Sequence, residues 1–289
     1  MIVVSILPYT TPFITKSISN IKKIKLENLS HTTSVVVWID PFDIDKLHQV
    51  LQTYPNIQFI QLMFSGVETV QSLYCFPIKI CCTKGAGTQY VAEHALTLAL
   101  SLIKKIPSSI KARNWTNQIY SSSLFNKKVL IIGKGGIGKS LFTLLEPFNC
   151  HISFHNKDTN LQDIISNFDI IFIACPLTQH TKKLFSKSLF EKMNPCSILI
   201  NVARGEIIDT EDLTDALLNQ KISGVGLDVI DPEPLQENHA LWRMDNVIIT
   251  SHNLYHLLKE SYLKRVIENI EAYTNNLPLK GMVDFAKGY

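Results

Sequence analysis

Features that place a protein in a membrane or on a nucleic acid are missing from this sequence. Its longest apolar stretch, residues 95–103, is much shorter than the roughly 20 residues that cross a bilayer, and it contains Thr97 and Ser101. The formal net charge is only +3, and the lysines are scattered along the chain; nucleic acid binding calls for a concentrated basic patch. The N-terminal sequence MIVVSILPY has no basic segment ahead of its short apolar run, so we expect no signal peptide.

Cysteine pairs with the C-x-x-C spacing are also missing. Of the six cysteines, none forms a C-x-x-C motif, and most fall in apolar runs that read as strands. We therefore expect free, buried thiols rather than disulfides or a metal site, and a reducing, cytoplasmic compartment. The six are Cys75, Cys81, Cys82, Cys150, Cys175 and Cys196.

Arginine is scarce. Only four of the 28 basic residues are arginines, at positions 113, 204, 243 and 265. A chain that otherwise uses lysine makes each arginine a candidate for a place that needs a planar, forked hydrogen-bond donor.

The patterns that are present alternate between strand and helix. With 289 residues and 46% hydrophobic composition, the chain is long enough for two domains, each with its own core. A helix over residues 91–106 is apolar nearly all round, so we expect it to be buried, to end at Pro107, and to start near the domain boundary. Before it, a small α/β domain is predicted from apolar runs at residues 2–7, 34–39, 57–62 and 78–82.

The stretch KVLIIGKGGIGKSLFTLLEPFNCHISFHNK, residues 128–157, is the central element of the sequence. A buried strand at 129–132 runs into a glycine cluster, then into an amphipathic helix and a second strand at 151–154. The N-terminus of such a helix attracts phosphate through its free N–H groups and its dipole.

These glycines fit two motifs. Gly133, Gly135 and Gly138 satisfy G-x-G-x-x-G, the turn that binds a dinucleotide. Together with Lys139 and Ser140, the outer two also satisfy G-x-x-x-x-G-K-S, the phosphate loop of nucleoside triphosphatases. A third possibility is that the glycines serve only a tight turn. The glycines alone do not distinguish these three possibilities, and the remainder of the chain is needed.

Polar or small residues follow each later strand of the pattern. The carboxyl edge of an open parallel sheet is where ligands bind. We predict strands at 169–174, 197–201, 224–227 and 247–250, which are followed by CPLT, VARG, Asp228 and Ser251-His252.

Three residues on these loops form a plausible catalytic set. Arg204 can clamp a carboxylate with two parallel hydrogen bonds. His252 can transfer a proton near neutral pH, and Glu233 can orient it and favour its charged form. Each also has an ordinary alternative: a structural histidine, a loop acid between Pro232 and Pro234, and an arginine that caps a carbonyl.

Several segments resemble one family, the D-isomer-specific 2-hydroxyacid dehydrogenases, which include glyoxylate/hydroxypyruvate reductases and phosphoglycerate dehydrogenases. The resemblance runs in order from about residue 58 to residue 252 and favours the dinucleotide motif. Its segments are GTQYVAEHALTLAL (87–100), ACPLTQHTKKLF (174–185), NVARGEIIDTEDL (201–213), GLDVIDPEPL (226–235) and LWRMDNVIITSH (241–252).

The resemblance implies roles for individual residues. Arg204 would bind the substrate, His252 would donate the proton, Glu233 would be its carboxylate partner, and Asp228 would hold the nicotinamide carboxamide. The turn Ser65-Gly66-Val67 would help to hold the substrate carboxylate. The cofactor would be lined by Gly133, Gly135, Gly136, Ile137, Gly138, Asn156, Lys157, Cys175, Pro176, Thr178, Thr181, Val202, Ala203 and Asp228.

The resemblance also implies an architecture: two α/β domains, a Rossmann-like dinucleotide-binding domain inserted in a flavodoxin-like substrate domain. We place the substrate domain at residues 1–91 and 256–289 and the dinucleotide-binding domain at 92–255. A homodimer formed through the long helix and the segment after it is implied as well. The activity implied is hydride transfer between a nicotinamide cofactor and a 2-keto acid or D-2-hydroxy acid.

Two departures from the family pattern bear on specificity. Relatives that use NAD usually carry an acid that binds the ribose hydroxyls at the end of the second cofactor-domain strand. Asn156 stands there, followed by Lys157, which favours NADP over NAD, although Asp158 comes next. Around His252, Ser251 and Asn253 also differ from the family and leave the choice of substrate open.

Two other functions stay open from the sequence alone. A phosphate-loop nucleoside triphosphatase would use Lys139. A catalytically silent, cofactor-sensing relative would keep the fold and the glycines, but the joint presence of Arg204, Glu233 and His252 argues against it.

Overall fold

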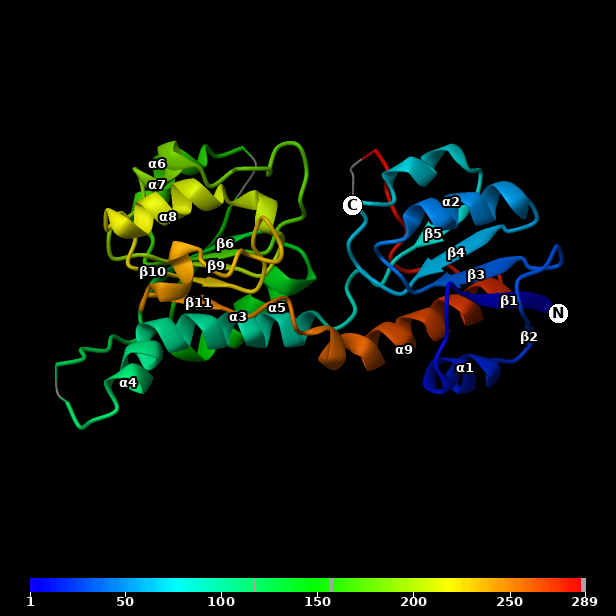
Figure 1. Cartoon of the computed structure of the whole chain (residues 1–289), viewed down its shortest axis with the longest axis horizontal. Coiled ribbons are helices and arrows are strands. Elements are labelled where there is room, and N and C mark those ends of the chain that lie inside the picture. Colours follow the sequence, from blue (N-terminus) through cyan, green and yellow to red (C-terminus); the bar gives the residue numbers. More distant parts are fainter. Residues whose placement is uncertain (117, 156–157, 287–289) are drawn as a thin grey trace. The chain divides into compact units, whose positions relative to one another are not determined.

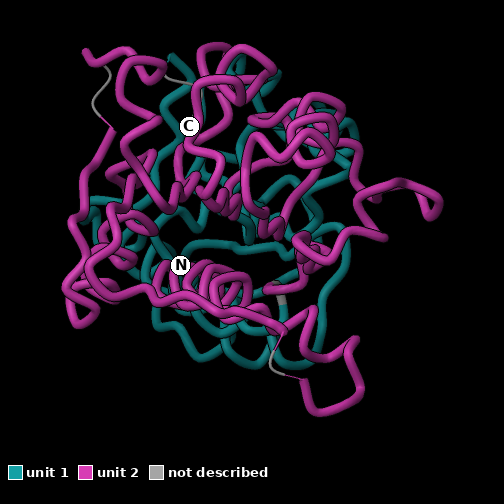
Figure 2. Tube along the Cα trace, turned by 90° about the vertical axis from the view of Figure 1, so that its left-hand side faces the viewer, with its two compact units in different colours: residues 1–87, 256–289 teal, residues 88–255 magenta. Residues whose placement is uncertain are grey.

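The computed structural model describes residues 1–116, 118–155 and 158–286. It divides into two compact units, one of residues 1–87 and 256–289 and the other of residues 88–255 (Figures 1 and 2). Each unit is an α/β domain whose strands pair in parallel, as the sequence predicts. Within the described residues, no helix has both the length and the apolarity that a membrane span requires.

The sheet of the first unit has five strands among the described residues, in the order β2-β1-β3-β4-β5. This order has the chain start near the middle and wind outward in both directions, which is the flavodoxin-like arrangement. The strands are β1 (Ile2–Leu7), β2 (Ile24–Leu26), β3 (Val35–Trp38), β4 (Phe59–Leu62) and β5 (Lys79–Cys81).

Helices cover both faces of this sheet. Helix α2 (Ile44–Thr53) lies on one face, and α1 (Pro12–Ser19) and α9 (Tyr255–Thr274) lie on the other (Figure 1). A short 3-10 helix, η1 (Gln71–Cys75), precedes β5. The C-terminal helix α9 joins the first unit through side chains: the rings of Phe59 and Tyr273 stack 4.9 Å apart, and Asn269 Nδ2 donates to Gln61 Oε1 at 2.7 Å.

The sheet of the second unit has six strands among the described residues, in the order β11-β10-β9-β8-β6-β7. From β6 the chain passes to β7 on one side and then to β8 on the other, so the switch point of the sheet lies between β6 and β8. The strands are β6 (Lys128–Ile132), β7 (His151–Phe154), β8 (Ile170–Ile173), β9 (Ile198–Asn201), β10 (Gly224–Leu227) and β11 (Val247–Ile249).

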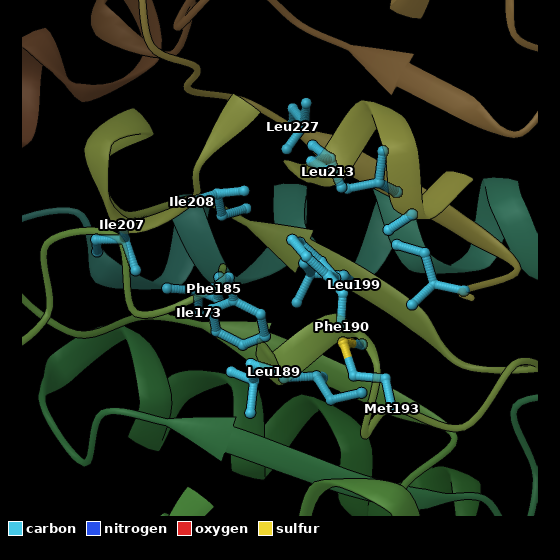
Figure 3. Packing of buried hydrophobic residues seen from close by; sticks show 14 of the residues in the cluster. Ile173, Phe185, Leu189, Phe190, Met193, Leu199, Ile207, Ile208, Leu213 and Leu227 are labelled. Atoms are coloured by element: carbon cyan, nitrogen blue, oxygen red, sulfur yellow. The ribbon is translucent and has the colours of Figure 1, made fainter. Parts of the chain in front are cut away.

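Alternate residues of each buried strand enter different cores, because successive side chains point to opposite faces. Val129 and Ile131 of β6 pack with α3 (Thr88–Ile103) and α5 (Gly136–Leu145). Leu130 and Ile132 pack on the other face, in a cluster that Figure 3 shows in part. That face is covered by α6 (Leu161–Ile164), α7 (Lys187–Phe190) and α8 (Thr210–Leu218) (Figure 1). The second unit also contains short 3-10 helices: η2 (Glu146–Phe148), η3 (Ile165–Asn167), η4 (Gly205–Ile207) and η5 (Ala240–Arg243).

The long apolar helix is buried along one face rather than all round, since Glu93 and Thr97 are exposed, and its end is not where the sequence suggested. Helix α3 ends at Ile103, and Pro107 lies in the first turn of a separate helix, α4 (Ile106–Ala112). Proline lacks the N–H that the first turn of a helix leaves unpaired anyway, so it starts this helix instead of ending the previous one.

The six cysteines are free, as predicted, but they are not all buried. Cys75 and Cys196 are exposed and Cys150 is partly buried. The two exposed thiols lie outside the buried strands, at the end of η1 and in the loop before β9.

Candidate active site

The glycine turn lies at the switch point of the second sheet. Gly133, the first residue after β6, has φ +116°, and a side chain there would come within 2.4 Å of the carbonyl oxygen of Ala174, which follows β8. Only glycine suits both the backbone conformation and this close approach. The loops after β6 and β8 therefore meet where open α/β sheets bind their ligands.

The start of α5 fits the pyrophosphate of a dinucleotide. Gly135 is the N-cap of α5 and no side chain caps the helix, so its first N–H groups have no side-chain acceptor. A Cβ on Gly135 would meet nothing within 4 Å, so the space beside the backbone is open to a ligand. Gly136 and Ile137 form the first turn, and Gly138 is buried.

The same geometry does not suit a phosphate loop. That motif needs the four residues between Gly133 and Gly138 to wrap around a phosphate. Helix α5 starts at Gly136, and the backbone N–H of Lys139 already donates to the carbonyl of Gly135 at 3.0 Å. Too little loop is left between the two glycines to enclose a phosphate.

The loop after β8 is held by Thr181. Its Oγ1 donates to the carbonyl of Pro176 at 2.8 Å and accepts from the backbone N–H of Thr178 at 2.8 Å. Burial raises the pKa of the Cys175 thiol to about 11, so this side chain is uncharged at neutral pH and offers no thiolate.

A buried amide fixes the turn that carries Arg204. Asn201, at the end of β9, accepts from the backbone N–H of Ala203 at 3.0 Å and donates to the carbonyl of Arg204 at 2.8 Å. The half-buried Arg204 in turn donates from Nη1 to the carbonyl of Ala203 at 2.6 Å. Val202 and Ala203 are buried. Asn201 is a positioning residue that sequence reasoning missed, although it stands in the quoted segment NVARG.

Asp228, which follows β10, is 4% exposed and belongs to a second network that sequence reasoning missed. Thr250 Oγ1 donates to Asp228 Oδ1 at 2.8 Å, and His94 Nε2 lies 2.8 Å from the same hydroxyl. A hydroxyl has one proton to donate, so the Thr250 hydroxyl has to accept from His94 while it donates to Asp228. His94 therefore carries its proton on Nε2.

His252 and Glu233 form a hydrogen-bonded pair on neighbouring loops. His252 Nδ1 lies 3.0 Å from Glu233 Oε1, and the two side chains are 49% and 43% exposed. Because a carboxylate only accepts, Nδ1 carries a proton and Nε2 is the ring atom left to exchange one. The backbone N–H of His252 donates to the carbonyl of Asp228 at 2.8 Å, which ties this loop to β10.

Backbone contacts bring the loops after β9, β10 and β11 together. The N–H of Asp228 donates to the carbonyl of Asn201 at 3.0 Å, and the Thr250 N–H donates to the carbonyl of Leu227 at 2.9 Å. A side chain on Gly205 would come within 2.1 Å of the Ile230 backbone, so the Arg204 turn packs directly on the loop that leads to Glu233. The arginine, the aspartate and the histidine–glutamate pair thus share one edge of one sheet.

Two further sets of predicted site residues remain predictions. Asn156 and Lys157 lie outside the described residues. Ser65, Gly66 and Val67 follow β4 in the first unit, where Ser65 Oγ lies 3.4 Å from the hydroxyl of Tyr262 in α9.

Comparison with known proteins identifies a family. The model of the D-isomer specific 2-hydroxyacid dehydrogenase, NAD binding domain, matches residues 95–253, which is more than half of the chain. A human glyoxylate reductase/hydroxypyruvate reductase is 30% identical over 220 residues, 68% of this chain and 67% of the human protein. A protein of Corynebacterium melassecola, described as an uncharacterized protein in the proB 3′ region, is 32% identical over 256 residues, 81% of this chain and 84% of its own length.

The fold also matches solved structures. The D-isomer specific 2-hydroxyacid dehydrogenase of Xanthobacter autotrophicus Py2, solved in complex with NADPH and MES, superposes with a TM-score of 0.85. The match covers 100% of this chain and 99% of that one at 20% sequence identity.

Proposed function

This chain belongs to the D-isomer specific 2-hydroxyacid dehydrogenase family, and we propose that it reduces a small 2-keto acid to the D-2-hydroxy acid with residues of the carboxyl edge described above. As a member of the family it is an NAD(P)-dependent oxidoreductase. The observation that carries the proposal for its residues is the His252–Glu233 pair, 3.0 Å apart and tied by backbone to Asp228.

The proposed mechanism uses each group for one task. A bound nicotinamide cofactor supplies the hydride. The Arg204 guanidinium holds the substrate carboxylate and the carbonyl oxygen in line, which reduces the orientational cost of the reaction. His252 Nε2 gives its proton to the oxygen as negative charge develops there, while Glu233 keeps Nδ1–H oriented and stabilises the imidazolium.

Further residues would hold the cofactor and the substrate. We assign the pyrophosphate to the open start of α5, and the carboxamide to Asp228, whose Oδ1 is fixed by Thr250. We also assign the loops that carry Cys175, Pro176, Thr178, Thr181, Val202 and Ala203 to the cofactor. The turn of Ser65, Gly66 and Val67 is assigned to the substrate carboxylate through its backbone N–H groups.

The substrate is proposed to be glyoxylate, hydroxypyruvate or a related 2-keto acid, because the human relative is a glyoxylate/hydroxypyruvate reductase. The test is an assay that follows nicotinamide absorbance with NADPH and then NADH against glyoxylate, hydroxypyruvate, pyruvate and a branched 2-keto acid. Turnover with at least one of them is expected. Tight cofactor binding without any turnover would favour the silent, cofactor-sensing alternative.

NADP is the proposed preferred cofactor, and Asn156→Asp is expected to change that preference. A carboxylate at this position binds both ribose hydroxyls and repels a 2′-phosphate, so the ratio of kcat/KM with NADPH to that with NADH should fall about tenfold or more. The matched control is Asp158→Asn, which should leave the ratio unchanged. If the control shifts the ratio and Asn156→Asp does not, another residue after β7 contacts the adenosine ribose.

A homodimer is proposed because large apolar side chains are exposed between α3 and β6. Ile110, Trp115 and Tyr120 are 71%, 100% and 82% exposed. Such exposure close together in the chain is typical of a surface that another subunit covers. Sedimentation at micromolar concentration should give the mass of two chains; a mass of 32.7 kDa, that of one chain, would contradict the proposal.

A cytoplasmic location is also proposed. The cysteines are free although two of them are exposed, which suits a reducing compartment. A fluorescent fusion found outside the cytoplasm would refute this.

A further inference from the structure

Lys134 places a cation between the first two glycines of the dinucleotide turn. Its side chain is exposed, and its Nζ lies over the ring of Phe154, 5.5 Å from the ring centroid. Phe154 is the last residue of β7, and its ring also stacks on Phe142 of α5, with the centroids 5.8 Å apart. The side chain therefore reaches from the loop after β6 to the carboxyl end of β7.

The register of the two strands defines where that ammonium lies. β6 and β7 are neighbours in parallel, with Ile131 opposite Phe154. In dinucleotide-binding sheets, the carboxyl end of the strand after the glycine turn is where the adenosine ribose is read, by an acid for a 2′-hydroxyl and by a cation for a 2′-phosphate. Lys134 thus places a positive charge at the point that separates NAD from NADP.

The contact that holds Lys134 leaves its charge available. An aromatic ring face attracts an ammonium only weakly at an exposed site, whereas a phosphate oxygen forms a strong charge-assisted hydrogen bond. The ring positions the Lys134 side chain but does not neutralise its charge. A carboxylate partner would neutralise it.

We propose that Lys134 binds the 2′-phosphate of an NADP-type cofactor and is a specificity-determining residue for this enzyme. The inference rests on the proposed function, because it needs a dinucleotide on the glycine turn. Asn156 and Lys157 are already expected to favour NADP. Lys134 would act in the same direction, and its position is described by the structure.

The test measures binding rather than activity. Dissociation constants of NADPH, NADH and adenosine 2′,5′-bisphosphate are measured with the full chain by fluorescence titration and calorimetry, at low and high salt. The variants are Lys134→Met, which keeps the length and the packing on Phe154 but removes the charge, and Lys134→Arg, which keeps the charge. Lys139→Met is the matched control, since Lys139 is an exposed lysine near the start of α5, close to Lys134 in the chain.

Loss of the Lys134 charge should weaken the binding only of ligands that carry a 2′-phosphate. Lys134→Met is expected to weaken the binding of NADPH and of adenosine 2′,5′-bisphosphate about tenfold or more, and to change the affinity for NADH less than twofold. It should also reduce the salt dependence of NADPH binding. Lys134→Arg should stay within about threefold of the wild type for all three probes. Lys139→Met should leave the ratio of NADPH to NADH affinity unchanged.

Other results would overturn the assignment. If Lys134→Met weakens NADPH and NADH equally, the lysine serves the shape of the loop, and if it changes neither, the lysine has no part in binding. In both cases a wild-type protein that binds NADPH and reduces a keto acid leaves the proposed function standing. A wild-type protein that binds none of the probes would refute the proposed function together with this inference.

Discussion

Replacing His252 with alanine is expected to lower kcat about 10²- to 10⁴-fold, the range that a general acid contributes. The variant loses Nε2, the ring atom proposed to protonate the substrate oxygen. It also loses Nδ1, which lies 3.0 Å from Glu233 Oε1. Cofactor affinity should change less than twofold, because the backbone bond from residue 252 to Asp228 remains. Single-turnover kinetics and cofactor titration measure the two effects separately.

The backbone of this loop calls for a second variant. His252 has φ +48°, a left-handed conformation that costs non-glycine residues roughly 1–2 kcal/mol. Asparagine tolerates that conformation better than most residues, so His252→Asn guards against a folding defect and should lose turnover as the alanine variant does. His151→Ala, an exposed histidine at the amino end of β7, is the matched control and should keep wild-type rates. Wild-type turnover by either His252 variant would refute its role.

Arg204→Lys is expected to lower kcat/KM about 10²- to 10³-fold, comparable to the loss of a fixed donor to a developing oxyanion. Lysine keeps the positive charge but not the planar fork that binds a carboxylate through two parallel bonds. It also loses the defined orientation that Arg204 has through its 2.6 Å bond from Nη1 to the Ala203 carbonyl. The loss should appear in kcat as well as in KM, because Arg204 is proposed to hold both the carboxylate and the carbonyl oxygen.

Arg243 provides the control for this substitution. It is an exposed arginine in η5, so Arg243→Lys should leave both kinetic constants unchanged. Cofactor affinity should be preserved in both variants. An Arg204→Lys enzyme with wild-type kcat/KM would mean that another group binds the substrate carboxylate.

Much of the fold could be predicted from the sequence because the strands of a parallel sheet are buried on both faces. Their apolar runs stand out, and β1, β7 and β10 begin and end at the predicted residues. Strand β2 and helix α1 were missed. β2 has three residues, one of them the exposed Lys25, at the edge of the sheet, where burial leaves only a weak hydrophobic pattern.

The candidate site was predictable in part. Loops at strand ends identified Arg204, Asp228 and His252 as candidates and suggested Glu233 as the partner of His252, and the resemblance implied the same pair. His94 was not predicted, because it stands in an apolar helix 156 positions before the Thr250 hydroxyl that it contacts. A contact at that separation leaves no local pattern in the sequence.

The stereochemistry of the product tests the central claim most directly. Pyruvate and hydroxypyruvate are incubated with the enzyme and reduced cofactor, and the hydroxy acid formed is separated by chiral chromatography. The D-enantiomer alone is expected, in step with the loss of nicotinamide absorbance. The L-enantiomer, a racemate, or no hydroxy acid from either substrate or any other 2-keto acid would contradict the assignment.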